Sequence, residues 1–349
     1  MKIGLYDPYM PILGGAERYI LAIANCLKTN NQIILYCDDS ELLNKAQEKF
    51  GLDTSFIETK KWEKDRNKRN MLLKELDLFF YVTDGSIFYS PVKRNVLIIQ
   101  TPLHIPRKSF ANLIKLFSWG TLICYSQFMA EIIHKNLGKT AQILFVPIQA
   151  TPAPTTAKTQ MIISVGRFFP NLHNKKQHQM VTAFKELIND GVSEVELCLV
   201  GSVDPGGEVY FQYVKDLAVN YPVRFVTSAS YQQLIELYQK AKVYWHAAGF
   251  GEDLENQPEK AEHFGVSTIE AMSYGCVPVV FAGGGQKEIV KNGLNGFYWG
   301  TLPQLKDHTT ELLTDKVMQA TLAQAAWKDA QQYTYETFDR RLYEILKFS

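Results

Sequence analysis

The sequence predicts an α/β protein built from two doubly wound domains, each with a parallel sheet covered by helices on both faces. The length of 349 residues is about twice that of a common domain. Short, continuously apolar runs alternate with amphipathic helical patterns, as expected for βαβ units. The alternation breaks at residues 148–158 (IQATPAPTTAK), whose composition is typical of an extended linker.

The first predicted domain covers residues 1–150. Its apolar runs predict strands at Lys2–Tyr6, Ile33–Cys37, Leu78–Val82, Val96–Gln100 and Leu122–Tyr125. The 3.6-residue periodicity predicts helices at Ala16–Lys28, Leu42–Phe50, Ala111–Trp119 and Phe128–Leu137.

The second predicted domain covers residues 151–334 and repeats the pattern. Strands are expected at Met161–Val165, Glu196–Val200, Val223–Val226, Val243–Ala247 and Val277–Phe281. Helices are expected at Gln177–Asn189, Glu208–Asn220, Tyr231–Ala241 and Val266–Tyr274. The last stretch, residues 335–349, predicts an amphipathic helix at Glu336–Phe348 that packs back on the first domain.

The composition excludes several classes of protein. A formal charge of +1, with 46% apolar and 21% charged residues, indicates a globular protein without a field that attracts nucleic acid. The basic stretch Lys60–Arg69 has no aromatic reader motif and is interpreted as a solvated helix or loop face. Five scattered cysteines indicate core thiols in a reducing compartment. Because the sequence shows neither a signal peptide nor a long apolar run, we expect a cytoplasmic protein, at most bound to a membrane surface.

The strongest chemical signal is the segment Glu262–Val280 (EHFGVSTIEAMSYGCVPVV), which places Glu262 and Glu270 around a predicted helix start. A helix N-terminus presents unpaired N–H groups and a partial positive charge, so it can bind a diphosphate. The candidate backbone donors are Gly265, Val266, Ser267 and Thr268. His263, Ser267 and Glu270 fall on one stripe of this helix. The alternative is a helix with two surface carboxylates, but an unpaired Glu270 in so apolar a run would be costly.

A second signal lies at Ser164–Phe184, where Gly166, Arg167, Lys175 and Lys176 follow a predicted strand. The carboxyl end of a strand is where open α/β sheets bind ligands, and these cations can neutralise a diphosphate. A solvated basic loop is the alternative. Gly14 and Gly15 form a third, weaker signal, for which an ordinary βα turn is equally suitable. Since neither half contains G-x-G-x-x-G after a strand, a dehydrogenase lacks its main support.

These three segments, in this order, resemble glycosyltransferase family 4, the retaining enzymes of the GT-B fold, over nearly the whole chain. The resemblance implies two Rossmann-like domains facing a central cleft, with the acceptor bound by the first and the nucleotide-sugar donor by the second. It also implies that Glu262 lies by the donor sugar, that Glu270 bonds the ribose, and that Arg167 and Lys175 bind the diphosphate. Lys176 competes with Lys175, because the alignment can slip by one residue. The stretch from His246 to Gly265 is similar to a subset of the family that contains mannosyltransferases.

One position departs from the family pattern. Many members have a histidine at the end of the fourth strand, where this chain has Gln100 in IIQTPLHIP. Gln100 can hydrogen-bond a sugar hydroxyl but cannot act as an acid or base. His104 is the other candidate for a sugar or acceptor contact here, and His263 is one in the second domain.

The predicted function is therefore transfer of a hexosyl group, mannose favoured, from a GDP- or UDP-linked sugar to a glycan or lipid-linked acceptor in surface polysaccharide or glycoconjugate synthesis. We expect no cofactor and no metal, because D-x-D is absent and Arg, Lys and a helix N-terminus can serve the phosphates. Alternatives are a sugar-nucleotide epimerase, a phosphorylase and a non-catalytic sugar-nucleotide-binding protein.

The helix expected within Lys108–Trp119 (KSFANLIKLFSW) has a broad apolar face flanked by lysines. Such a helix is either buried on the sheet or in contact with a bilayer that carries the acceptor. Burial is the favoured interpretation, because the alternation requires a helix that covers the sheet at this point.

Overall fold

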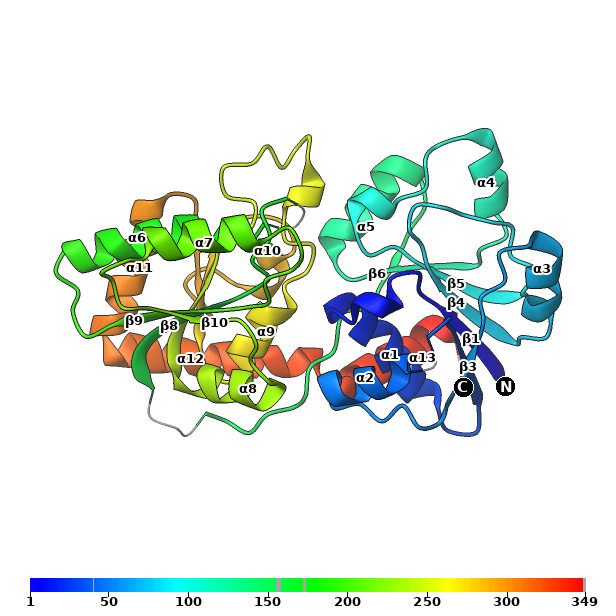
Figure 1. The fold of residues 1–349 in the computed structure, drawn as a ribbon, viewed down its shortest axis with the longest axis horizontal. Coiled ribbons are helices and arrows are strands. Elements are labelled where there is room, and N and C mark those ends of the chain that lie inside the picture. Colours follow the sequence, from blue (N-terminus) through cyan, green and yellow to red (C-terminus); the bar gives the residue numbers. More distant parts are fainter. Residues whose placement is uncertain (40, 155–157, 172–173, 348–349) are drawn as a thin grey trace. The chain divides into compact units, whose positions relative to one another are not determined.

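The computed structural model describes residues 1–39, 41–154, 158–171 and 174–347. The chain divides into two compact units (Figure 1). Unit 1 comprises Met1–Pro147 with Tyr335–Ser349, and unit 2 comprises Ile148–Thr334. Residues 155–157 of the predicted linker and Phe348 of the predicted last helix lie outside the described residues.

Unit 1 contains a seven-stranded parallel sheet in the order β3-β2-β1-β4-β5-β6-β7. Its strands are β1 (Lys2–Tyr6), β2 (Gln32–Tyr36), β3 (Ile57–Lys60), β4 (Leu78–Val82), β5 (Arg94–Ile98), β6 (Thr121–Cys124) and β7 (Gln142–Ile143). The central β4 is buried at every residue, as a parallel strand covered on both faces should be.

Helices cover both faces of this sheet (Figure 1). One face carries α3 (Arg66–Lys74), α4 (Phe110–Leu116) and α5 (Gln127–Leu137), and the other carries α1 (Gly15–Leu27), α2 (Leu42–Phe50) and α13 (Tyr335–Leu346). Short 3-10 turns follow β1 and β5, namely η1 (Met10–Ile12) and η2 (Pro102–His104). The return of α13 to α1 closes the core, where Phe338 packs edge-on against Tyr19.

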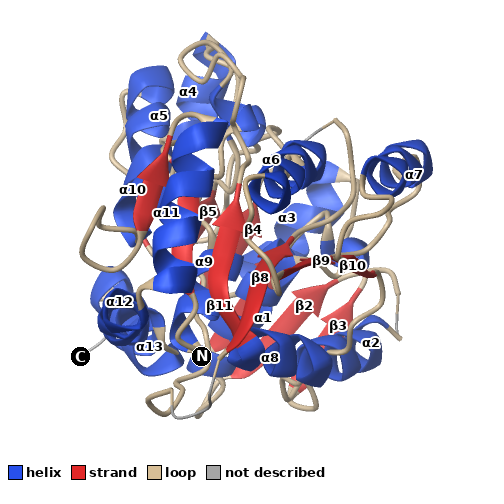
Figure 2. Cartoon of the chain, turned by 90° about the vertical axis from the view of Figure 1, so that its left-hand side faces the viewer, coloured by secondary structure: helices blue, strands red, loops and turns tan. Residues whose placement is uncertain are grey.

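Unit 2 repeats the winding with a six-stranded parallel sheet, β10-β9-β8-β11-β12-β13. Its strands are β8 (Thr159–Val165), β9 (Glu196–Val200), β10 (Val223–Val226), β11 (Ala241–His246), β12 (Val277–Phe281) and β13 (Phe297–Trp299). Figure 2 shows its helices around the sheet. They are α6 (Gln177–Asn189), α7 (Glu208–Leu217), α8 (Tyr231–Lys240), α9 (Val266–Ser273), α10 (Gln286–Ile289), α11 (Leu302–Thr314) and α12 (Lys316–Ala330), with a 3-10 turn, η3 (Pro258–Lys260), before α9 and another, η4 (Gln331–Tyr333), after α12.

The alternation is confirmed, and the strands that it missed are short and lie at the edges of the sheets. The peripheral β3 has one buried residue in four, so it has no apolar run. The outer strands β7 and β13 have two and three residues. A two-residue period cannot be recognised in strands this short. The helices α3, α10, α11 and α12 were also not predicted.

The prediction that the apolar face of α4 is buried was wrong for most of its side chains. Leu116 and the following Trp119 lie in the core, but Phe110 and Phe117 are 81% and 77% exposed. A helix of seven residues needs few side chains to cover its part of the sheet, so its other apolar residues remain outside. Among the described residues, no helix is long and apolar enough to cross a membrane.

Candidate active site

The candidate site lies in unit 2, at the carboxyl ends of β8 and β11. These neighbours flank the point where the strand order reverses, which is the usual ligand position in an open α/β sheet. Gly166 and Arg167 follow β8, and His246 ends β11. Lys175 comes just before α6, and Glu262 comes shortly before α9. The predicted segment from Arg167 to Lys176 also contains residues 172 and 173, which lie outside the described residues.

Glu262 joins the two predicted segments through its carboxylate. Its Oε2 accepts a hydrogen bond from the ammonium group of Lys175 and another, at 2.8 Å, from Nε2 of His246. The side chains of Glu262 and Lys175 are only 15% and 20% exposed. A buried carboxylate with two donors has a fixed orientation, as a group beside a reacting sugar requires.

The charge states of this cluster follow from its burial. Burial alone would raise the pKa of Glu262, but the charge of Lys175 and the hydrogen bond from His246 hold this pKa well below its usual value. Burial lowers the pKa of His246 despite the nearby carboxylate. His246 is therefore neutral at pH 7 and donates through Nε2, while its buried Nδ1 has no hydrogen-bond partner within the described chain.

Close packing against Gly166 brings Lys175 to the carboxyl edge of the sheet. A Cβ at Gly166 would fall 2.5 Å from Cγ of Lys175, so only glycine leaves room for the lysine stem. Gln177 fixes the same turn, since its Nε2 donates to the carbonyl oxygens of Gly166 and Arg167 at 3.1 and 3.0 Å. The guanidinium of Arg167 is half exposed and pairs with Asp204 at 2.9 Å.

The structure separates the two candidate lysines. Lys176 has the left-handed backbone φ of 57°, and its ammonium group pairs with Glu252 at 2.5 Å, away from Glu262. The other oxygen of Glu252 pairs with Lys260 at 2.6 Å. The pKa of Glu252 is lowered, mainly by its bonds to these two lysines. Lys175 is therefore the lysine that contacts the predicted Glu262, and Lys176 ties the loop after β11 to the start of α6.

The start of α9 has the geometry expected of an anion-binding helix terminus. Gly265 caps it with φ 116°, where a Cβ would fall 2.8 Å from Nε2 of Gln286. The N–H of Thr268 already bonds the Gly265 carbonyl, and its hydroxyl accepts from Gln286 at 2.9 Å. The backbone of Val266 and Ser267 is thus better placed for a phosphate than that of the fully buried Thr268.

Three further predicted residues surround this helix. The hydroxyl of Ser267 lies 2.7 Å from that of Tyr244 on β11. Glu270 is partly exposed one turn into α9, and its charge contributes to the raised pKa of the buried Tyr238. His263 does not share the stripe of Ser267 and Glu270, because it is buried before the helix begins and its Nε2 lies 3.2 Å from the Glu259 carbonyl oxygen.

His246 was not predicted as a site residue, although the family-like stretch from His246 to Gly265 begins with it. A polar residue at the end of an apolar strand was the available signal. The glycines of the GGGQKEIV stretch, residues 283–290, were expected to let a loop approach the donor, and in the structure they pack against the backbone around Glu262. A Cβ at Gly285 would lie 2.7 Å from the His263 carbonyl oxygen, and its N–H donates to the Glu262 carbonyl at 2.8 Å. This stretch therefore supports the backbone that carries Glu262.

The predicted residues of the first domain lie in unit 1. Gly14 caps α1, and its N–H donates to the carboxylate of Glu17 at 2.5 Å, while Gly15 is exposed. Gln100 is buried after β5, which is the fifth strand once β3 is counted. His104 is half-buried against Tyr9, with their rings stacked at 5.0 Å and Nε2 3.1 Å from the tyrosine hydroxyl.

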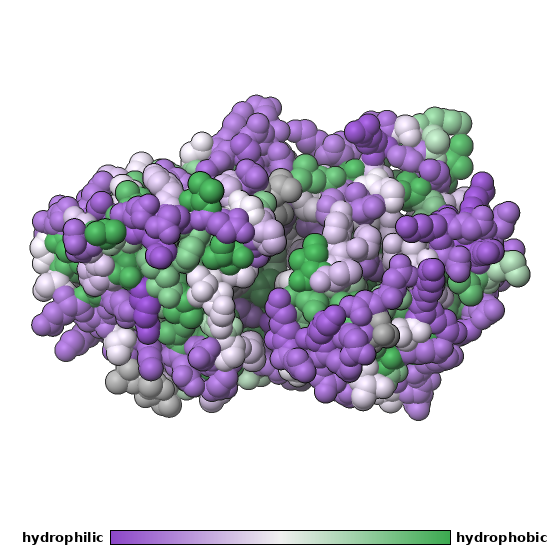
Figure 3. Space-filling view, viewed as in Figure 1, coloured by the Kyte–Doolittle hydropathy of each residue, from purple (hydrophilic) through white to green (hydrophobic). Residues whose placement is uncertain are grey.

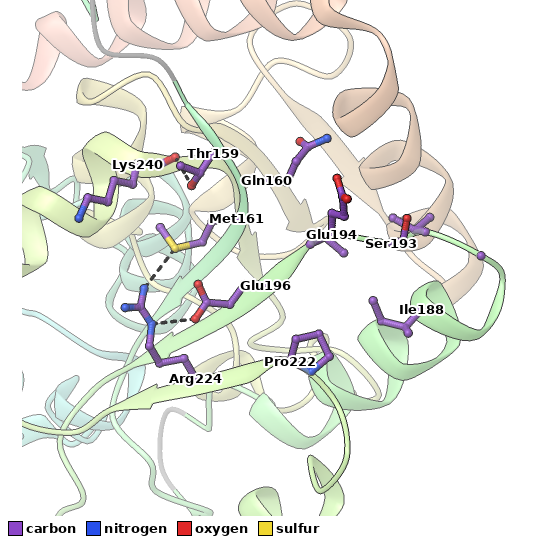
Figure 4. Close-up of a pocket in the computed structure, with 13 residues that line it drawn as sticks. Thr159, Gln160, Met161, Ile188, Ser193, Glu194, Glu196, Pro222, Arg224 and Lys240 are labelled. Atoms are coloured by element: carbon purple, nitrogen blue, oxygen red, sulfur yellow. Dashed lines mark hydrogen bonds and ion pairs between the residues drawn. The ribbon is translucent and has the colours of Figure 1, made fainter.

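A cavity of about 860 Å³ opens at the opposite, amino-terminal edge of the unit 2 sheet (Figure 4). Arg224 crosses it and bonds Glu196 at 2.9 Å and Sδ of Met161 at 3.4 Å. None of the predicted residues lines this cavity. Its charged groups compensate each other, so we place the site at the carboxyl edge.

Comparison with known proteins identifies the family. The model of the family described as glycosyl transferases group 1 matches residues 149–329, just over half of the chain. The chain belongs to this family. The matched residues lie within unit 2 and include Arg167, Lys175, Glu262 and Glu270, so the family region and the candidate site coincide.

The relatives of this glycosyltransferase group 1 chain are longer proteins, and their sequence identity to it is low. It is 29% identical to a glycogen synthase of Chlorobium phaeobacteroides over 36% of the chain and 23% of that protein. It is 24% identical to "GDP-Man:Man(3)GlcNAc(2)-PP-Dol alpha-1,2-mannosyltransferase" of Dictyostelium discoideum over 54% of the chain and 37% of that protein. The chain thus spans about a quarter to a third of the length of these relatives.

Solved structures show that the group 1 member has the GT-B fold. The Anabaena protein Alr3699/HepE, in complex with UDP and glucose, is 19% identical, with a TM-score of 0.71 over 99% of both chains. A glycosyltransferase of Rickettsia africae is 14% identical, with a TM-score of 0.73 over 100% of this chain and 99% of the other. Among the described residues, no group of three or more His, Cys, Asp or Glu side chains could hold a metal ion.

Proposed function

We propose that this chain is a retaining hexosyltransferase that moves a sugar from a nucleotide diphosphate donor to a glycan or lipid-linked acceptor in surface polysaccharide or glycoconjugate synthesis. The observation that carries the proposal is the cluster of Lys175, Glu262 and His246 at the switch point of unit 2, where Arg167 also follows the end of β8. Two cations, an oriented carboxylate and a helix N-terminus meet the needs of a sugar diphosphate.

In this proposal the chain binds, orients and stabilises charge. Arg167 and Lys175 neutralise the leaving diphosphate together with the N–H groups of Val266 and Ser267. Glu262 holds the sugar and Glu270 the ribose. Because His246 is neutral, its role is to hold Glu262 in place. The cationic groups make a required metal unnecessary, and no cofactor takes part.

Mannose is the favoured sugar because mannosyltransferases that use GDP-mannose are among the relatives. The solved structures that contain UDP and UDP-glucose support a uridine donor as the second candidate. A cytoplasmic location is part of the proposal, and the free state of all five cysteines supports it.

The test is release of nucleoside diphosphate from GDP-mannose and UDP-glucose, with and without an acceptor mixture of cell glycans and lipid-linked glycans. Acceptor-dependent release, with the anomeric configuration retained in the product, is expected. Conversion of the nucleotide sugar without acceptor would identify an epimerase, and release that depends on inorganic phosphate would identify a phosphorylase. If GDP or UDP raises the melting temperature but no turnover is detected, the chain is a non-catalytic sugar-nucleotide-binding protein.

A further inference from the structure

The outer side of α4 carries an apolar strip that covers nothing in unit 1. Phe110, Ile114 and Phe117 lie at helical spacing and are 81%, 49% and 77% exposed. The inner side of the same helix already supplies the core with Leu116. Figure 3 shows apolar surface over α4. Large exposed apolar side chains that gather on one face indicate a surface that meets another apolar phase.

A loop from elsewhere in unit 1 extends this surface with a tyrosine. Tyr89 is 58% exposed, and the N–H of the next residue, Ser90, donates to Oγ of Ser118 at 2.8 Å. The indole of Trp119 donates to the Phe88 carbonyl at 2.9 Å from the other side. These two bonds hold Tyr89 beside the end of α4. The α4 strip is defined as Tyr89, Phe110, Ile114 and Phe117.

The segment that carries the α4 strip is cationic. Between Asp84 and Glu131 the sequence contains no acidic residue, and its basic residues other than Arg94, which bonds the Leu346 carbonyl of α13 at 2.8 Å, are Lys93, Arg107, Lys108 and Lys115. The ammonium group of Lys139 lies 4.6 Å from the ring centroid of Phe117. Although the whole chain is nearly neutral, this segment is cationic, so it favours a partner with negative charge.

We infer that the α4 strip docks on an anionic lipid bilayer. Aromatic side chains with adjacent lysines match the headgroup boundary, where rings enter the acyl region and ammonium groups reach the lipid phosphates. A second copy of the chain would present the same cationic surface, and the like charges would oppose each other. The inference goes beyond the proposed transferase function, because none of its residues belongs to the donor site.

The experiment is sedimentation of the full chain with vesicles of phosphatidylcholine, alone or mixed with phosphatidylglycerol. Binding is expected only to the mixed vesicles and should weaken with salt. Phe110→Ser and Phe117→Ser should each lower the partition coefficient about tenfold or more, since each removes a ring from the membrane. Lys108→Gln with Lys139→Gln should reduce the preference for phosphatidylglycerol.

Met71→Ser is the matched control, because Met71 is 71% exposed on α3 of the same unit. It should leave the partition coefficient unchanged, and all variants should keep the thermal shift with nucleoside diphosphates, which tests the transferase proposal separately. No binding to mixed vesicles at low salt would overturn the inference, as would equal losses from Met71→Ser and Phe117→Ser. The inference would also be overturned if the chain self-associates without vesicles and Phe117→Ser abolishes this association, because the α4 strip would then bind a second copy of the chain.

Discussion

The two units share one winding, but the carboxyl edges of their sheets carry opposite chemistry. In unit 2, the segment after β8 brings Lys175, and the end of β11 brings His246, to the carboxylate of Glu262. In unit 1, the residue after β1 is Asp7, which is 2% exposed, and its buried Oδ2 has no hydrogen-bond partner among the described residues. The comparison shows that the strand order fixes where a site lies, whereas the residues after each strand decide what it can bind.

The two edges also respond to pH in opposite directions. Burial, reinforced by the charge of Glu17, raises the pKa of Asp7 to about 8. The pKa values of Glu262 and His246 are both lowered. Unit 1 therefore contains a carboxyl group that is stable in its protonated form, and unit 2 contains a charged carboxylate with a neutral imidazole.

The largest expected effect tests the cationic character of the unit 2 edge. Arg167→Ala should reduce turnover about 10²–10³-fold, because it removes a donor aimed at the charge that develops on the diphosphate. The fold should lose less than about 1 kcal/mol, since Arg167 is half exposed and its ion pair with Asp204 lies at the surface. Turnover and thermal unfolding measure the two quantities.

Asp204→Asn is the control for that variant, because it breaks the same ion pair from the other side. It should leave turnover nearly unchanged. If Asp204→Asn is as inactive as Arg167→Ala, the arginine acts through its ion pair and not on the donor. Lys175→Ala should match the loss of turnover but also destabilise the fold, because it leaves Glu262 buried with only His246.

The second effect concerns the two glutamates of unit 2. Glu262→Gln should lower turnover about tenfold to a hundredfold, because the amide lacks the charge that Lys175 and His246 hold in place. Glu270→Gln should instead weaken binding of the free nucleoside diphosphate about tenfold, as expected for a lost ribose contact. Calorimetric affinities and turnover numbers separate the roles, and equal losses in both quantities would show that they are not separable.

The third effect tests the opposite pH responses. The pKa of Asp7 is raised in the folded state, so its protonated carboxyl group stabilises the fold below the ordinary pKa of 3.8. This stabilisation is lost as the pH rises through about 8. Asp7→Asn should therefore gain stability over the native chain between pH 4 and 8, by several degrees at pH 8. Melting temperatures across this range measure it.

Asp84→Asn is the matched control at the same edge, after β4. The pKa of Asp84 is lowered: burial would raise it, but its hydrogen bonds from Ser86 prevail. Its contribution is present above the ordinary pKa and is lost as the pH falls, so Asp84→Asn should not gain stability at pH 8. If the melting temperatures of Asp7→Asn and of the native chain change in parallel with pH, the two units do not differ in their response to pH.

The smallest effect separates the adjacent lysines. Lys176→Met should change nucleoside diphosphate affinity less than about threefold, because Lys176 is already paired with Glu252. Lys175→Met should weaken it clearly more. If titrations show a larger loss of affinity for Lys176→Met than for Lys175→Met, Lys176 binds the diphosphate and the predicted alignment shifts by one residue.

The sequence by itself determined the two-domain α/β organisation, most helices and strands within a few residues, and the segments around Arg167 and Glu262. These features depend on local periodicity and on motifs that are contiguous in the chain. The short edge strands β3, β7 and β13 were missed because their pairing depends on a neighbour that is distant in sequence.

Only the tertiary structure decided which charged groups meet. Lys175 and Glu262 are 87 residues apart, and His246 reaches the same carboxylate from another strand end. It also decided that Lys176 bonds Glu252, and that Phe110 and Phe117 face outward from α4. Helical periodicity shows that a face is apolar, but whether that face is covered depends on how much of the sheet the neighbouring helices already occupy.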